Sequence, residues 1–128
     1  MAYKFQQLEI YEIALEYIDL IYELAEKLPR HEDFNLKSQI TRAATSIALN
    51  IAEGSTGQSN PEQCRFLGMA LRSLIETVAC QDIIRRRRYA TSADLEKIGE
   101  RGVKLFAKIQ SMRRSLSRPS SVVGPPNE

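Results

Sequence analysis

The stretch Arg42–Gly54, which reads RAATSIALNIAEG, carries the strongest information about the architecture of this chain. Ten consecutive residues, 43–52, carry no charge and mix small side chains with large aliphatic ones. Neighbouring helices can approach such a helix closely from more than one side. Gly54 is expected to end the helix, because glycine adopts the left-handed conformation at a helix C-terminus without strain. The stretch therefore predicts a central, closely packed helix.

The polar residues of this stretch suggest a role in assembly. Asn50 falls on the seam of apolar residues with three-four spacing, and a buried amide is costly unless it is hydrogen-bonded. A single asparagine in a helix core is also a known means of fixing register and oligomer state. We therefore predict that Arg42, Asn50, Glu53 and Gly54 are assembly residues, with the polar ones in a buried network at a helix or subunit interface.

Three more segments have helical periodicity on either side of this stretch, at residues 6–28, 61–87 and 93–116. Pro29 should end the first, Ser59 should cap the third with Pro61 in its first turn, and Thr91 or Ser92 should cap the fourth. No segment alternates with period two. Residues 1–116 are therefore predicted to form an all-α, antiparallel up-down-up-down four-helix bundle. Residues 117–128 lack periodicity and are predicted to be a disordered tail.

The first helix carries more apolar surface than one bundle core uses. Its apolar residues form two interleaved seams of three-four spacing, whereas a helix with one buried face needs one. Together with the small-residue stretch, this predicts a homo-oligomer with helix faces buried between subunits. Closed cyclic symmetry is the usual arrangement.

The charges are unevenly divided along the chain, although its net charge is only +2. Residues 1–84 hold seven Lys/Arg against twelve Asp/Glu, and residues 85–128 hold eleven against four. Acidic residues form a stripe on the first helix. Cations gather in the second half, at Arg85, Arg86, Arg87 and Arg88 and at Lys97, Arg101, Lys104 and Lys108.

Three explanations for these cations stay open. The arginine run complements the negative end of the third helix, but four adjacent cations repel one another and exceed that need. Phosphate contact is the second explanation, which makes all eight residues candidate nucleic-acid ligands. In the third, the acidic and basic stripes meet each other between helices or subunits. The chain is then a purely structural interaction scaffold without nucleic-acid binding.

The remaining chemistry-bearing residues predict no enzyme. The single histidine, His31, falls in a polar loop, and no catalytic set or metal site can be assembled without it. Cys64 and Cys80 are expected on one helix, about 24 Å apart, which is too far for a disulfide. No uncharged segment approaches the roughly 20 residues of a membrane span. We therefore expect a non-enzymatic cytoplasmic protein without a cofactor or a metal.

The central stretch resembles the hallmark of a known family. Arg42-Ala43-Ala44-Thr45-Ser46-Ile47, followed by Asn50-Ile51-Ala52-Glu53-Gly54, is similar to the signature of the 23S rRNA intervening-sequence proteins of bacteria. The similarity covers roughly residues 5–112. The resemblance implies a four-helix bundle that assembles as a homopentamer. It also implies kinship with accessory proteins of diversity-generating retroelements, whose basic surfaces contact nucleic acid and a reverse transcriptase.

Overall fold

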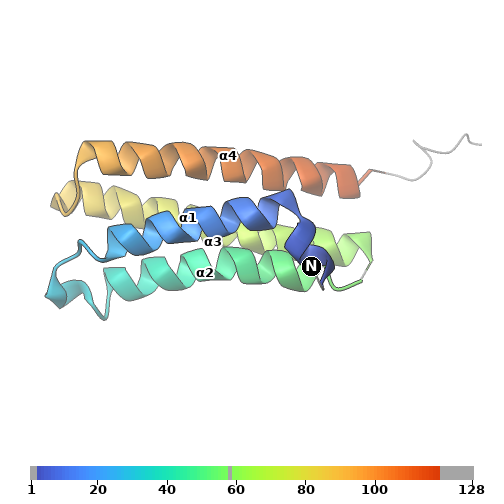
Figure 1. Ribbon diagram of the computed structural model, residues 1–128, viewed down its shortest axis with the longest axis horizontal. Coiled ribbons are helices and arrows are strands. Elements are labelled where there is room, and N and C mark those ends of the chain that lie inside the picture. Colours follow the sequence, from blue (N-terminus) through green and yellow to red (C-terminus); the bar gives the residue numbers. More distant parts are fainter. Residues whose placement is uncertain (1–2, 58, 119–128) are drawn as a thin grey trace, which may run out of the picture.

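The computed structural model describes residues 3–57 and 59–118, which fold into four long helices (Figure 1). They are α1 (Glu9–Ala25), α2 (Leu36–Gly54), α3 (Asn60–Arg87) and α4 (Ser92–Leu116). Two short 3-10 helices, η1 (Lys4–Gln7) and η2 (Arg30–Glu32), precede α1 and α2. The prediction of an all-helical bundle of four helices is confirmed for these residues, among which no strand occurs. The predicted tail lies, from residue 119 onward, outside the described part.

The caps of α3 and α4 are confirmed. The Ser59 hydroxyl accepts a hydrogen bond from the backbone N–H of Glu62 at 3.3 Å, and Thr91 caps Asp94 in the same way at 3.2 Å. These short side chains satisfy N–H groups that have no partner inside the helix. Local sequence therefore fixes where both helices begin.

The start of the first helix differs from the prediction. The chain was expected to become helical near Gln6, but Leu8 is extended (φ −76°, ψ 132°) and separates η1 from α1. The break turns η1 back so that the Phe5 ring meets the Tyr11 ring edge-on, 5.0 Å between centroids. This aromatic contact accounts for the interruption of a sequence that is otherwise compatible with a continuous helix.

Each helix contacts two others around the bundle. α2 lies between α1 and α3, and α4 lies between α3 and α1, so that α1 and α3, like α2 and α4, are diagonal pairs whose backbones do not approach each other within residues 3–57 and 59–118 (Figure 1). The α1/α2 side of the bundle is therefore opposite the α3/α4 side.

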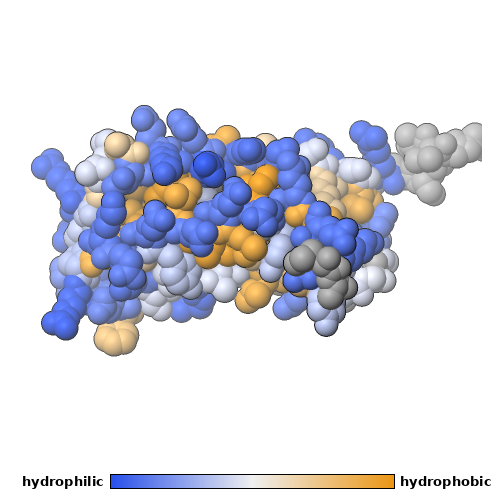
Figure 2. Space-filling model, in the orientation of Figure 1, coloured by the Kyte–Doolittle hydropathy of each residue, from blue (hydrophilic) through white to orange (hydrophobic). Residues whose placement is uncertain are grey.

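The core is filled by one stripe from each helix. On α1 the buried seam contains Ile10, Ile13, Tyr17 and Leu24, while Leu15 and Tyr22 of the other seam remain exposed. On α3, Ile75 and Val78 continue the three-four apolar spacing of Leu71 and Leu74, but they are 53% and 40% exposed. The polar residues Thr77 and Gln81 of α3 are buried in the core instead. Figure 2 shows apolar surface remaining between the hydrophilic side chains on one face.

The polar core residues form one hydrogen-bonded chain from α3 to α1. Gln81 Nε2 donates to the Tyr17 hydroxyl at 2.9 Å, and that hydroxyl lies 2.8 Å from Thr77 Oγ1. Thr77 donates its one proton to the carbonyl of Leu74 at 2.6 Å, so Tyr17 must donate to Thr77. Burial raises the pKa of Tyr17, and its bonds to Thr77 and Gln81 oppose this rise. Gly102 of α4 makes room for the ring, since a Cβ there would lie 3.3 Å from it.

Gly54 does not have the predicted left-handed conformation. The only glycine with positive φ in the described part is Gly57 (φ 88°), and Gly54 is the last residue of α2. Its role is a close approach between helices, because a Cβ at this position would lie 2.7 Å from Cβ of Phe66 on α3. Carbon atoms in van der Waals contact are about 3.5–4.0 Å apart. The absence of a side chain therefore allows α2 and α3 to meet here.

Within the described ranges, no helix is both long and apolar enough to cross a membrane. The same residues contain no group of three or more His, Cys, Asp or Glu side chains placed to hold a metal ion.

Candidate nucleic-acid interface

The four arginines occupy the C-terminal end of α3 and the turn that follows it. Arg85, Arg86 and Arg87 form the last turn, and Arg88 adopts a left-handed conformation (φ 61°, ψ 37°). The backbone N–H of Tyr89 reaches back to the carbonyl of Ile84 at 3.1 Å, which closes a Schellman motif around Arg88. The left-handed residue turns the chain sharply, and all four arginine side chains are exposed.

Most of this positive charge has no carboxylate partner. Arg85 makes one ion pair, with Asp82 one turn earlier, at 3.5 Å. Arg86, Arg87 and Arg88 make none with the residues that the structure describes. The end of α3 is therefore a concentrated, solvated cationic surface, as phosphate binding requires.

The loop before α2 is joined to this end of α3. The Tyr89 hydroxyl donates to Glu32 Oε2 at 2.9 Å, and His31 Nε2 lies 3.2 Å from the same hydroxyl. The His31 and Tyr89 rings meet edge-on with centroids 6.2 Å apart. Phe34, two residues past η2, is 98% exposed. Arginines and solvent-accessible aromatic rings therefore belong to the same end of the bundle, a combination typical of single-strand binding sites.

Glu32 is the structural centre of this loop. Its carboxylate accepts from Tyr89, from Asn35 Nδ2 at 3.1 Å and from the backbone N–H of Leu36 at 3.4 Å in the first turn of α2. The bond from Tyr89 is the main cause that lowers the pKa of Glu32, and burial acts in the opposite direction. The ionised side chain thus holds α2, the loop and the end of α3 together.

We expect Glu32→Gln to lower the melting temperature at pH 7 and to have a smaller effect in acid. A carboxyl group whose pKa is lower in the folded state stabilises the fold above its unfolded pKa, which is about 4.3, and loses that contribution as the pH falls through the folded pKa. Thermal unfolding of both proteins between pH 7 and pH 3 measures this. A difference in melting temperature that does not shrink towards pH 3 contradicts the prediction.

The basic stripe of α4 is half neutralised by α1. Arg101 Nη1 lies 3.5 Å from Glu16, and Lys108 Nζ lies 3.3 Å from Glu9. Lys97 and Lys104 make no ion pair with any described residue. The stripes on α1 and α4 thus meet within one chain at two of the four predicted positions. Among the described residues, no hydrogen bond or ion pair joins the stripe to the arginine run.

The predicted polar network of α2 is not buried within one subunit. Asn50 is half-buried and bonds within its own helix, from Nδ2 to the carbonyl of Ser46 (2.9 Å) and to its Oγ (3.0 Å). Ser73 of α3 donates to Ser46 Oγ at 3.0 Å and completes the link between helices. Arg42 and Glu53 are exposed. The prediction of a core position for Asn50 is therefore wrong for the single chain, because the seam turns towards the α2/α3 edge.

Two structural features are not predictable from the local sequence. The exposure of Phe34 and the role of Glu32 depend on the loop that packs against Tyr89, which is far away in the sequence. A groove between α3 and α4 arises because Ile75 and Val78 lie outside the core. In the sequence, the only indication of either feature is Phe34, an aromatic residue in an otherwise polar loop.

Comparison with known proteins identifies the fold and the family of this chain. A crystal structure of a protein of unknown function from the S23 ribosomal protein family, from Bacteroides thetaiotaomicron VPI-5482, is similar to this fold with a TM-score of 0.76. The two sequences are 26% identical, and the match covers 82% of this chain and 98% of that one. No curated protein matches the chain. The 23S rRNA-intervening sequence protein family matches residues 6–111, which include all four helices almost completely. The chain therefore belongs to the 23S rRNA-intervening sequence protein family.

Proposed function

We propose that this protein is a non-enzymatic, self-assembling bundle that binds RNA or another nucleic acid through the end of α3. The observation that carries the proposal is the run Arg85–Arg88, which is exposed and has one carboxylate partner among the described residues. Guanidinium groups bind phosphates with paired, charge-assisted hydrogen bonds. Affinity is then governed by the backbone, with little dependence on base sequence.

The surroundings of the run favour single-stranded nucleic acid. Phe34 offers a fully exposed ring at the same end of the bundle, and unpaired bases stack on such rings. Duplexes keep their bases stacked on one another and offer only the phosphate contacts. Lys97 and Lys104 extend the cationic surface along α4, whereas Arg101 and Lys108 are engaged by α1.

The proposal also includes the direction of the helices and the number of subunits. We infer an antiparallel up-down-up-down order, because ion pairs join the start of α1 to α4 near its end (Glu9–Lys108) and the end of α1 to the start of α4 (Lys27–Asp94, 2.6 Å). The exposed apolar residues of α1 and α3 support a cyclic homo-oligomer. The family resemblance suggests five subunits, in the cytoplasm.

Removing the arginine charges is expected to abolish retention of a single-stranded RNA at physiological salt. The suitable variant carries Arg85→Gln, Arg86→Gln, Arg87→Gln and Arg88→Gly, because glycine accepts the left-handed conformation at 88. Titration of a fluorescent RNA by anisotropy over a range of salt concentrations measures the effect. The plot of log affinity against log salt should become less steep by about 0.7 for each phosphate that the variant no longer neutralises.

A matched control distinguishes binding at the end of α3 from a general effect of positive charge. Lys97→Gln with Lys104→Gln removes exposed cations on α4 and should weaken binding less than the change at α3. Phe34→Ala should weaken binding to single strands and leave duplex binding unaltered. Unchanged RNA binding by the arginine variant, with its oligomer intact, would rule out the end of α3 as the site.

A second candidate function is a structural interaction scaffold without nucleic-acid affinity. The ion pairs Glu16–Arg101 and Glu9–Lys108 favour it, because they pair two residues of the basic stripe with acids on α1 of the same chain. This function predicts no RNA binding by the wild-type protein at physiological salt in the same titration. It also predicts that high salt dissociates the assembly.

A further inference from the structure

The outer face of α1 combines apolar and acidic side chains that point away from the core, and the Tyr22 hydroxyl there lies 3.3 Å from Thr45 Oγ1 of α2. Leu15 and Tyr22 are 36% and 47% exposed, and Glu12, Asp19 and Glu26 alternate with them at spacings of three and four. These spacings place all five on one helix face. In the described part of the chain, none of the three acids forms an ion pair, in contrast to Glu9 and Glu16. Leu49, 56% exposed, continues the apolar surface onto α2.

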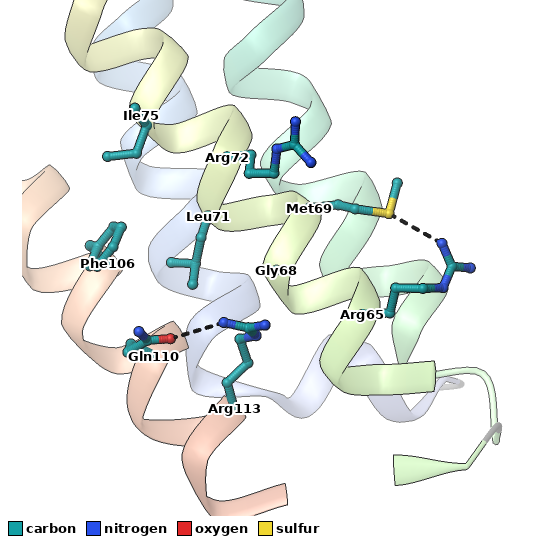
Figure 3. Close-up of a pocket in the computed structure, with 9 residues that line it drawn as sticks. All are labelled: Arg65, Gly68, Met69, Leu71, Arg72, Ile75, Phe106, Gln110 and Arg113. Carbon is teal, nitrogen blue, oxygen red and sulfur yellow. Dashed lines mark hydrogen bonds between the residues drawn. The ribbon is translucent and has the colours of Figure 1, made fainter. Parts of the chain in front are cut away.

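The opposite side of the bundle carries an open groove between α3 and α4. One part of it, of about 670 Å³, is lined by Phe106, Gln110 and Arg113 of α4 and by Leu71 and Ile75 among the residues of α3 (Figure 3). A second part, of about 370 Å³, shares Ile75 and Phe106 and continues along Val78 and Val103. Val103 is 72% exposed. The two parts therefore form one groove along the helix pair, with apolar residues at its centre.

Arginines border one end of this groove. Arg113 is fixed across Gly68, where it donates from Nε to the carbonyl of Cys64 (3.2 Å) and from Nη1 to Gln110 (3.4 Å). Neither contact neutralises its charge. Arg72 projects from α3 and is exposed (Figure 3). Both lack a carboxylate partner within residues 3–57 and 59–118, so the end of the groove is cationic.

We propose that the α3/α4 groove of one copy binds the α1/α2 face of the next copy. Each face combines exposed apolar side chains with charged ones, and the acids on α1 are matched by arginines at the groove. The faces differ and lie on opposite sides of the bundle, so the contact is head-to-tail and repeats from subunit to subunit, which produces a ring when the rotation closes. The inference rests on the proposed self-assembly and specifies its interface.

The size of the faces is adequate for a stable contact. Twenty residues of helix span about 30 Å, and two helices side by side are about 20 Å wide, so each face offers about 600 Å². Stable interfaces bury about 600–1,000 Å² per partner, so the area of each face is at the lower end of that range. Both halves of the contact are present on this chain, which is why a second copy is the expected occupant.

Two variants that each damage one face test the arrangement. The first carries Asp19→Lys and Tyr22→Lys on α1, and the second carries Arg72→Glu and Val103→Glu on the groove. All four residues are exposed in the single subunit, so folding should be retained, as circular dichroism will verify. Light scattering after size exclusion should find each variant at the 14.5 kDa mass of one chain. An equimolar mixture should form heterodimers and no larger ring, because the intact groove of the first variant binds the intact α1/α2 face of the second, while the two damaged faces remain at the ends of the pair.

The outcomes distinguish the arrangement from its alternatives. Lys97→Glu, on the α1/α4 side, should keep the wild-type mass and serves as the control. If one variant alone keeps the wild-type mass, only one face is used and the head-to-tail contact is wrong. Two monomeric variants that fail to assemble on mixing also overturn it. A monomeric wild-type protein overturns the proposed self-assembly itself.

Discussion

Tyr17→Ala should lower the free energy of unfolding by about 3–5 kcal/mol, in the range measured for buried aromatic residues replaced by alanine. The ring is 1% exposed and fills the centre of the bundle against Gly102 of α4. Its hydroxyl also links Gln81 to Thr77. Since domains of this size are stable by about 5–15 kcal/mol, the variant should be close to unfolding. Urea denaturation followed by circular dichroism, at one fixed protein concentration, measures the loss.

Tyr17→Phe separates the hydrogen bonds from the ring. It keeps the packing but leaves Gln81 Nε2 without its acceptor, so we expect a loss of about 1–3 kcal/mol. Phe34→Ala is the matched control, because that ring is 98% exposed and its removal should change stability by less than about 0.5 kcal/mol. If Tyr17→Phe proves as stable as the wild type, the buried hydrogen-bond chain has no energetic importance.

Gly54→Ala should lower the free energy of unfolding by about 1–3 kcal/mol, the usual cost of overpacking. The new Cβ would lie 2.7 Å from Cβ of Phe66, an atom attached directly to the backbone of α3. Neither carbon can rotate away, so the two helices must separate. The cost should exceed the gain of about 1 kcal/mol that alanine brings to a helix interior. The same denaturation experiment measures the difference.

Gly99→Ala should change the free energy of unfolding in the opposite direction to Gly54→Ala. Gly99 is also helical, but a Cβ there meets no atom within 4 Å. This substitution should raise stability by about 0.5–1 kcal/mol, because alanine loses less backbone entropy than glycine. If both variants gain stability, the close approach of α2 and α3 at Gly54 is not a constraint.

Much of the bundle can be predicted from local sequence. Ser59 and Thr91 cap the third and fourth helices, and three-four spacing marks the buried residues of α4 from Leu95 to Ile109. Such signals act between residues a few positions apart, so they need no knowledge of the fold. The motif of α2 likewise sufficed for the family resemblance that the match over residues 6–111 confirms.

The candidate site was predictable only in part. Four consecutive arginines at the end of a helix are visible in the sequence, and the structure leaves them exposed. That Arg101 and Lys108 meet Glu16 and Glu9 was not predictable, because these partners are more than eighty positions apart. A stripe of cations looks the same in sequence whether it faces solvent or another helix.

Local sequence is enough to set the number of helices, most of their ends and the family. The rotation of each helix about its own axis, in contrast, is a property of the folded bundle. α1 has two apolar seams, so its sequence is compatible with two rotations, and packing against the other helices buries the seam of Tyr17. The same packing places Thr77 and Gln81 in the core, and turns Ile75 and Val78 outward. Rotation depends on contacts between distant segments, and it determines which surfaces remain exposed for the proposed contacts with RNA and with neighbouring subunits.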